Sequence, residues 1–263
     1  MTAFRALVRK ELATLFASPL AYLALTLVML VTALIFFDHL RIYNQILFLY
    51  SSNTMGGFES DTIPDHINVR DSVFFPVLET LGITLIALIP VLTMRVFAEE
   101  RARGTDELLL TTHLSPSQIV AAKFLVTYGF VLLMMAGSFV YPAMATVEGG
   151  IGLEHLLAVF MGLSLHALGL ASLGLVCSAF SSSQLMAAVA SWAAGFVLWD
   201  FAWAGAFVGE RTGRVLDLLS MHQRYGSFSE GLVSLEHIAY FAGLGLLCAA
   251  LARFSFDLRR VAG

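Results

Sequence analysis

Charged residues are scarce in this sequence. Asp, Glu, Lys and Arg make up 13% of its 263 residues, about half of their usual share in a globular protein. The charges gather in short segments between long apolar runs, and 58% of all residues are hydrophobic. One soluble core of this length cannot bury so much apolar surface. The composition therefore excludes an ordinary soluble domain and indicates a polytopic protein surrounded by a lipid bilayer.

Cysteine is rare, and the motifs of common enzymes are missing. Cys177 and Cys248 lie in apolar runs, without a nearby His or Cys that would complete a metal site. The sequence contains neither a Gly-x-x-x-x-Gly-Lys-Ser/Thr motif for nucleotide phosphates nor a Gly-x-Ser-x-Gly elbow. The Glu-Glu-x-x-x-Arg pattern of prenyl-protein proteases would need arginine at the position of Gly104. We therefore expect no catalytic residues, metal ligands or bound cofactor, and the net charge of -4 indicates no nucleic-acid partner.

Six apolar stretches are candidates for membrane-spanning helices. A spanning helix needs about 20 apolar residues, and a helix pairs its backbone N–H and C=O groups internally. The predicted spans cover residues 20–37, 74–96, 117–147, 156–180, 185–208 and 237–254. The second, fifth and sixth carry ionisable side chains near an end, where these can reach the interface. The sequence thus predicts an all-α integral membrane protein with six spans and a single domain over residues 1–263.

The basic residues indicate the orientation of these spans. With the N-terminus inside, ten Lys and Arg residues fall in cytoplasmic segments and five fall outside. Cytoplasmic loops carry the excess of positive charge in most membrane proteins. We therefore predict that both termini are cytoplasmic. Residues 38–72 then form a polar outer loop, and residues 207–236 form a second outer segment of short interfacial or re-entrant helices.

Residues 1–18 precede the first span and have a helical pattern of their own. Apolar residues recur at helical spacing opposite a basic face, which consists of Arg5, Arg9 and Lys10. This pattern predicts an amphipathic helix that lies along the inner surface of the membrane. Alternatively, the first spanning helix simply begins early.

The cytoplasmic segment between the second and third spans has the most ordered pattern. Gly104 allows a sharp turn, and Thr105 is a plausible N-cap for a short surface helix. Two acidic residues in the first turn and an apolar ridge follow: Asp106, Glu107, Leu108, Leu109 and Leu110. Ser115 and Pro116 suit the cap and the first position of the next helix. Without this order of residues, the segment would be interpreted as a solvated turn between two spans.

This segment resembles the cytoplasmic loop of ABC-2 type permeases, the membrane subunits of ATP-binding cassette transporters. The resemblance rests on Glu100-Arg101-x-x-Gly104-Thr105-x-Glu107-x-Leu109, followed by Thr112, Ser115 and Lys123-Phe124. The layout of an entry helix, six spans and a re-entrant segment before the last span is also similar to that family. Two positions depart from the family pattern: His113-Leu114 replaces a proline and an aliphatic residue, and Ala122 replaces a glycine.

The resemblance implies how the chain acts. In that family the short helix is a coupling helix, which sits in a cleft of a separate ABC ATPase that binds ATP and Mg. It implies a coupling loop over residues 99–113, with contacts from Glu99, Glu100, Arg101, Gly104, Thr105, Glu107, Leu108, Leu109 and Leu110. It also implies a second permease subunit, identical or homologous, and a bacterial inner membrane. The expected function is ATP-driven transport, by export.

Residues 222–231, His-Gln-Arg-Tyr-Gly-Ser-Phe-Ser-Glu-Gly, are similar to the subgroup of gliding-motility-associated and nitrous-oxide-reductase-maturation permeases. A different function is compatible with the same residues. The complex could transmit force or a signal to a periplasmic partner through residues 38–72 and 207–236, without moving a substrate. The sequence does not identify a substrate.

Two features of the fourth span are open to interpretation. His166 is ionisable and lies deep in the span, so it serves either a substrate or proton, or packs between helices with a hydrogen bond to a neighbour. Small residues also recur four apart in the fourth and fifth spans. The pairs are Ala167 and Ala171, Gly174 and Ser178, Ala187 and Ser191, and Ala190 and Ala194. They predict that these two helices pack tightly on each other.

Overall fold

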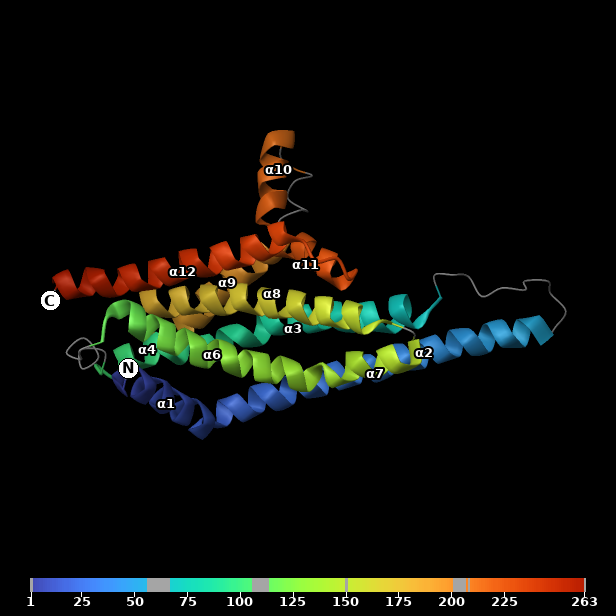
Figure 1. Cartoon of the computed structure of the whole chain (residues 1–263), viewed down its shortest axis with the longest axis horizontal. Coiled ribbons are helices and arrows are strands. Elements are labelled where there is room, and N and C mark those ends of the chain that lie inside the picture. Colours follow the sequence, from blue (N-terminus) through green and yellow to red (C-terminus); the bar gives the residue numbers. More distant parts are fainter. Residues whose placement is uncertain are drawn as a thin grey trace.

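The computed structural model describes residues 2–55, 67–105, 114–149, 151–200, 207 and 209–262. Its regular elements within these ranges are all helices (Figure 1). In chain order they are α1 Thr2–Ala17, α2 Pro19–Met55, η1 Arg70–Phe74, α3 Phe75–Thr93, α4 Arg95–Ala102, α6 Pro116–Ser138, α7 Val140–Gly149, α8 Leu153–Phe180, α9 Gln184–Trp199, α10 Glu210–Leu219, α11 Met221–Ser229 and α12 Leu235–Ala262.

Five helical stretches are long and apolar enough to cross a membrane. They are Pro19–Ser52, Arg70–Ala102, Pro116–Met144, Leu153–Phe180 and Leu235–Leu258. The predicted span over residues 185–208 corresponds to α9, which has 16 residues and is therefore about 24 Å long. This is shorter than a full crossing, so the count of six spans stays a prediction.

The predicted outer loop over residues 38–72 was wrong for most of the part that the structure describes. Helix α2 is 37 residues long and ends only at Met55, and the π-helix η1 already begins at Arg70. The helix persists because apolar residues keep recurring after Asp38, and Leu40 and Tyr43 pack against the core. Residues 56–66 of the predicted loop lie outside the described residues.

Helix α8 lies at the centre of the bundle (Figure 1) and contacts α3, α4, α6, α9, α11 and α12. Its length is almost wholly apolar, and its inward positions are small or buried residues such as Gly162, Ala167 and Ala171. A side chain at Gly162 would collide with Phe228 of α11, since a Cβ there would lie 2.3 Å from the Phe228 Cβ. In contrast, α2 and α12 lie at the periphery and leave broad apolar faces uncovered.

Two short helices occupy the segment between α9 and α12. Helix α11 packs into the bundle through Met221, Tyr225 and Phe228, and the Tyr225 hydroxyl donates a hydrogen bond to the Leu78 carbonyl at 3.0 Å. Helix α10 instead projects away from the bundle (Figure 1). Their interfacial or re-entrant placement in a membrane stays a prediction.

Candidate functional site

The second spanning stretch bends where it approaches the predicted coupling loop. Proline has no N–H to donate within a helix, and Pro90 precedes the break at Met94 that separates α3 from α4. The hydroxyl of Thr93 donates back to the carbonyls of Ile89 and Pro90 within α3. The bend therefore makes α4 a distinct helical segment at the end of α3.

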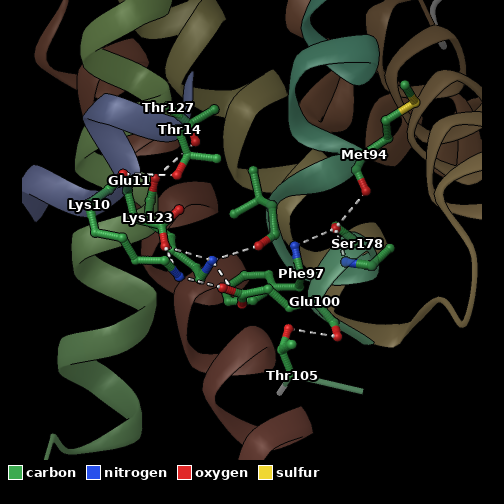
Figure 2. Close-up of polar contacts among 12 residues, drawn as sticks. Lys10, Glu11, Thr14, Met94, Phe97, Glu100, Thr105, Lys123, Thr127 and Ser178 are labelled. Carbon is green, nitrogen blue, oxygen red and sulfur yellow. Dashed lines mark hydrogen bonds and ion pairs between the residues drawn. The ribbon is translucent and has the colours of Figure 1, made fainter. Parts of the chain in front are cut away.

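Helix α8 supplies the residues that hold this bend. The Ser178 Oγ accepts hydrogen bonds from the backbone N–H groups of Phe97 and Ala98, at 3.0 and 3.1 Å, and donates one to the Met94 carbonyl at 3.0 Å (Figure 2). One turn earlier, Gly174 allows the two helices to touch, because a Cβ there would lie 2.1 Å from the Thr93 Oγ1. The prediction that the fourth and fifth spans pack on each other is confirmed by the contacts between α8 and α9, but Gly174 and Ser178 serve the contact of α8 with α3 and α4 instead.

Lys123 of α6 joins three helices through buried charge (Figure 2). Its Nζ lies 3.2 Å from a Glu11 carboxylate oxygen of α1 and 2.9 Å from a Glu100 carboxylate oxygen of α4, and donates to the Val96 carbonyl at 2.8 Å. The Lys123 side chain is only 1% exposed, whereas the two carboxylates are about 15% exposed. A buried ammonium group requires such partners, because removing a charge from water costs several kcal/mol.

Lys10 of α1 completes this charge network, which consists of Lys10, Glu11, Glu100 and Lys123. Its Nζ lies 3.1 Å from Glu100 and 3.4 Å from Glu11. Partial burial lowers the pKa of Lys10, but the hydrogen bonds and charges of Glu100 and Glu11 together outweigh this effect and raise the pKa above its ordinary value. Two positive and two negative groups thus balance each other where α1, α4 and α6 meet.

Two further arginines connect α4 to its surroundings. The Arg95 guanidinium donates to the Ser18 Oγ at 3.0 Å, at the joint between α1 and α2. The Arg101 guanidinium donates to the carbonyls of Ala179 and Ser181, at the end of α8. Cationic groups are favourable there, because the last carbonyls of a helix carry partial negative charge. The Ser255 hydroxyl of α12 also donates to Ala179, at 2.8 Å.

The predicted turn at Gly104 is confirmed. Gly104 has a φ of 66°, and its N–H donates to the Arg101 carbonyl at 3.1 Å. The Thr105 N–H donates to the Glu100 carbonyl at 2.9 Å, and the Thr105 hydroxyl donates to the same carbonyl. These two backbone bonds form a Schellman motif that ends α4. The glycine is needed because other residues rarely adopt a positive φ.

The start of α6 also agrees with the prediction. Ser115 caps the helix, Pro116 is its first residue, and Ser115 and Gln118 exchange the two hydrogen bonds of a capping box. The predicted coupling loop is thus preceded by a defined turn at the end of α4 and followed by a capped start of α6.

The structure brings together the predicted site residues that it describes. Glu99 pairs with Arg103 at 2.6 Å, Glu100 with the two lysines, and Arg101 with the end of α8. The remaining predicted residues, Glu107, Leu108, Leu109 and Leu110, lie outside the described residues. A groove of about 660 Å3 runs beside this site between α1, α4 and α6.

Sequence reasoning missed several residues of this site. The sequence places Lys10 on the basic face of a predicted surface helix and Ser178 among small packing residues, and it gives no sign of a role for Glu11. Lys123 belongs to the family pattern, but a single lysine in a sequence does not indicate that its side chain is buried. A usable signal was the presence of charges on three separate segments that all border the same predicted cytoplasmic surface.

His166 lies far from this site, in a buried aromatic cluster. Its ring centroid is 4.8 Å from Trp199 and 5.8 Å from Tyr225. The Gly82 carbonyl is near the ring, but within the described residues neither ring nitrogen has a partner with hydrogen-bond geometry. The packing interpretation therefore lacks its expected hydrogen bond. No group of three or more His, Cys, Asp and Glu side chains in the described part of the chain could hold a metal ion.

These observations define a class: a polytopic helical membrane protein whose long loop between two spans is anchored by charge to the bundle. Residues 58–210, more than half of the chain, match the family model of the ABC-2 family transporter protein, and the chain belongs to this family. It is thus a membrane permease subunit of an ABC transporter, a kind of subunit that works with a separate ATPase. No curated protein matches the chain.

Proposed function

We propose that this chain couples ATP hydrolysis by a separate ABC ATPase to export across a bacterial inner membrane. Residues 99–113 form the coupling loop, both termini lie in the cytoplasm, and α9 with the residues after it completes a sixth span. ATP and Mg bind to the ATPase, not to this chain.

The observation that carries this proposal is the buried charge network around Lys123. It connects α4, which leads directly into the coupling loop, to α1 and to α6, which follows the loop. Arg95 and Arg101 extend the connection to the start of α2 and the end of α8. A displacement of the loop by the ATPase is therefore transmitted to four helices of the bundle at once, instead of being absorbed by a flexible turn.

Within the loop, the residues divide between inward and outward roles. Glu100 and Arg101 are engaged inside the permease, and Gly104 and Thr105 set the direction in which the chain leaves α4. We assign the ATPase contact to the Leu108, Leu109 and Leu110 ridge, which supplies apolar area, and to Glu99 and Glu107, which fix the register by charge.

A second permease subunit fits along α2. The exposed side chains of this helix include an apolar stripe with alternating spacings of four and three residues: Leu23, Leu27, Leu30, Leu34 and Phe37. This is the spacing of a two-helix seam. The stripe supports a dimer in which the two copies pack along α2. The similarity of residues 222–231 to gliding-motility-type permeases supports the same assembly in a motility-type system.

The test begins with the chain purified from its native membrane in mild detergent. We expect a soluble P-loop ATPase to co-purify and to hydrolyse ATP in the complex. Leu109→Asp should remove the ATPase, because a carboxylate in place of the central leucine cannot be buried without a partner. The matched control is Leu153→Asp at the opposite end of α8, where the leucine is 68% exposed. This variant should retain the ATPase.

Two results contradict the proposal. If Leu109→Asp leaves both complex formation and stimulated ATP hydrolysis intact, the loop is not the coupling site. If the complex hydrolyses ATP but moves no lipid, peptide or polysaccharide in vesicles, while an outer partner changes its conformation, force transmission replaces transport.

A further inference from the structure

A groove of about 620 Å3 runs between three helices of the bundle. It lies between α6, α8 and α12, and its lining includes Ala121, Phe124, Leu168, Leu175, Leu246 and Ala249. We name it the α6–α8–α12 groove. Its volume is in the range of sites that hold small molecules, about 300 to 1,000 Å3.

The interior of this groove offers nothing to a polar ligand. Ser172 is the polar side chain in its middle, and the Ser172 hydroxyl already donates to the Leu168 carbonyl of its own helix at 2.7 Å. The other polar lining residues, Ser117 and Arg253, lie at the end near the start of α6. All three helices belong to membrane-spanning stretches, so the groove faces hydrocarbon. A hydrocarbon chain therefore fits its interior.

The length of the groove matches one leaflet of a bilayer. Along α12 its lining extends from Ala242 to Arg253. Eleven residues of helix correspond to about 17 Å, and half of the hydrocarbon layer is about 15 Å thick. An acyl chain that enters at Arg253 thus ends near Ala242, at the middle of the bilayer.

The positive charge of Arg253 at the end of the groove indicates an anionic lipid headgroup. The Arg253 side chain is 59% exposed, and its Nε lies 3.5 Å from a carboxylate oxygen of Asp257. This pair is long and exposed, so it contributes little and leaves the guanidinium available. Arginine binds phosphate with parallel hydrogen bonds. The positive end of the α6 dipole lies at this end of the groove, beside Ser117, whose hydroxyl shares a hydrogen bond with the Ser115 Oγ at 3.0 Å.

We propose that the α6–α8–α12 groove binds an anionic phospholipid, with one acyl chain in the groove and the phosphate on Arg253. The leaflet is the one next to the coupling loop. The bound chain fills the space that α12 leaves against α6 and so fixes the position of α12. The proposal rests on the groove and not on ATPase coupling, so either can fail without the other.

Lipid binding can be measured by native mass spectrometry of the delipidated protein. Dioleoyl phosphatidylglycerol or dioleoyl phosphatidylcholine is added back, and the bound fraction is compared. We expect the wild-type protein to retain one phosphatidylglycerol in preference to phosphatidylcholine. Ala249→Phe should lower this binding about tenfold, because the ring occupies part of the groove that the acyl chain would fill. Leu247→Phe, at a neighbouring α12 position that is 59% exposed and outside the groove, should bind as the wild type does.

Arg253→Gln tests the headgroup separately and should abolish the preference for phosphatidylglycerol. A measurement on the unaltered protein covers the case in which Ala249→Phe does not fold. Phosphatidylglycerol with a photoreactive diazirine in one chain should label peptides of α6, α8 and α12. Equal binding of both lipids to the wild type and to Ala249→Phe would overturn the proposal, as would labelling confined to α2 and α9.

Discussion

At the end of the bundle where α1, α4 and α6 meet, most buried polar side chains have partners, with the Nε of Arg95 as an exception, whereas around α11 several have none within the described residues. Lys123 contacts two carboxylates and a carbonyl although its side chain is almost wholly buried. Near α11, both ring nitrogens of His166, the Nδ1 atoms of His222 and His237, and the Nε of Arg224 are buried without a hydrogen-bond partner in the described residues.

The difference shows that the two regions are held by different forces. Directional hydrogen bonds and ion pairs fix α4 against its neighbours. Removing one partner leaves the other charge or N–H group buried and unpaired, which costs free energy. Around α11, ring contacts add to hydrogen bonds such as that from the Tyr225 hydroxyl to the Leu78 carbonyl, with Trp199 lying 4.8 Å from His166 and 4.9 Å from His222. Packing of this kind depends on shape and tolerates apolar replacement. The end near the loop should therefore be the more sensitive to polar substitutions.

The largest effect is expected for Lys123→Met. The replacement leaves Glu11 and Glu100 without their buried cation, so the free energy of unfolding should fall by about 3 kcal/mol. It can be measured by denaturation in detergent. Lys10→Met is the control, because this lysine is 55% exposed and its pairs are worth at most about 1 kcal/mol. If the two substitutions have the same effect, the network is not the anchor that the distances indicate.

A smaller effect is expected for Ser178→Ala. Without the hydroxyl, the N–H groups of Phe97 and Ala98 lose their acceptor at the bend, which should cost about 2 kcal/mol of stability. Ser172→Ala on the same helix is the control, since its hydroxyl only donates to a carbonyl of its own helix. Thermal unfolding of both variants provides the comparison. Equal midpoints would show that Ser178 does not hold the bend.

The smallest effect on stability is expected for His166→Phe. The phenyl ring keeps the contacts with Trp199 and Tyr225 and removes two unpaired nitrogens, so stability should stay the same or rise by about 1 kcal/mol. The same variant separates the two interpretations of His166. A loss of stability would reveal a hydrogen bond to the ring, whereas a loss of transport with unchanged stability would indicate a role with substrate or protons.

The sequence was sufficient for the five long apolar helices and for the two turns that bound the predicted coupling loop. Long apolar runs predict spans, and Gly104, Ser115 and Pro116 have local conformational preferences that their own chemistry determines. The length of α2 was underestimated, because polar residues such as Asp38 and Arg41 interrupt the apolar run without interrupting the helical spacing. A hydropathy argument detects where the membrane ends, but a helix can continue beyond it.

The charge network could not be predicted from the sequence. Glu11, Glu100 and Lys123 are far apart in the chain, and each alone resembles an ordinary residue of a solvated surface. Their pairing depends on how α1 folds back onto α4 and α6, which is a tertiary contact. The same applies to Gly174, whose neighbour Thr93 belongs to a different span.

Helix α2 is long and uninterrupted, so a rotation at one of its ends displaces the other end. The helix is about 55 Å long, and its inner end is the joint at Ser18, which Arg95 of α4 contacts. A tilt of about 5° at this joint displaces the far end, at Met55, by about 5 Å over that length. A small rotation at the Ser18 joint thus becomes a movement larger than an atom at the other end of α2.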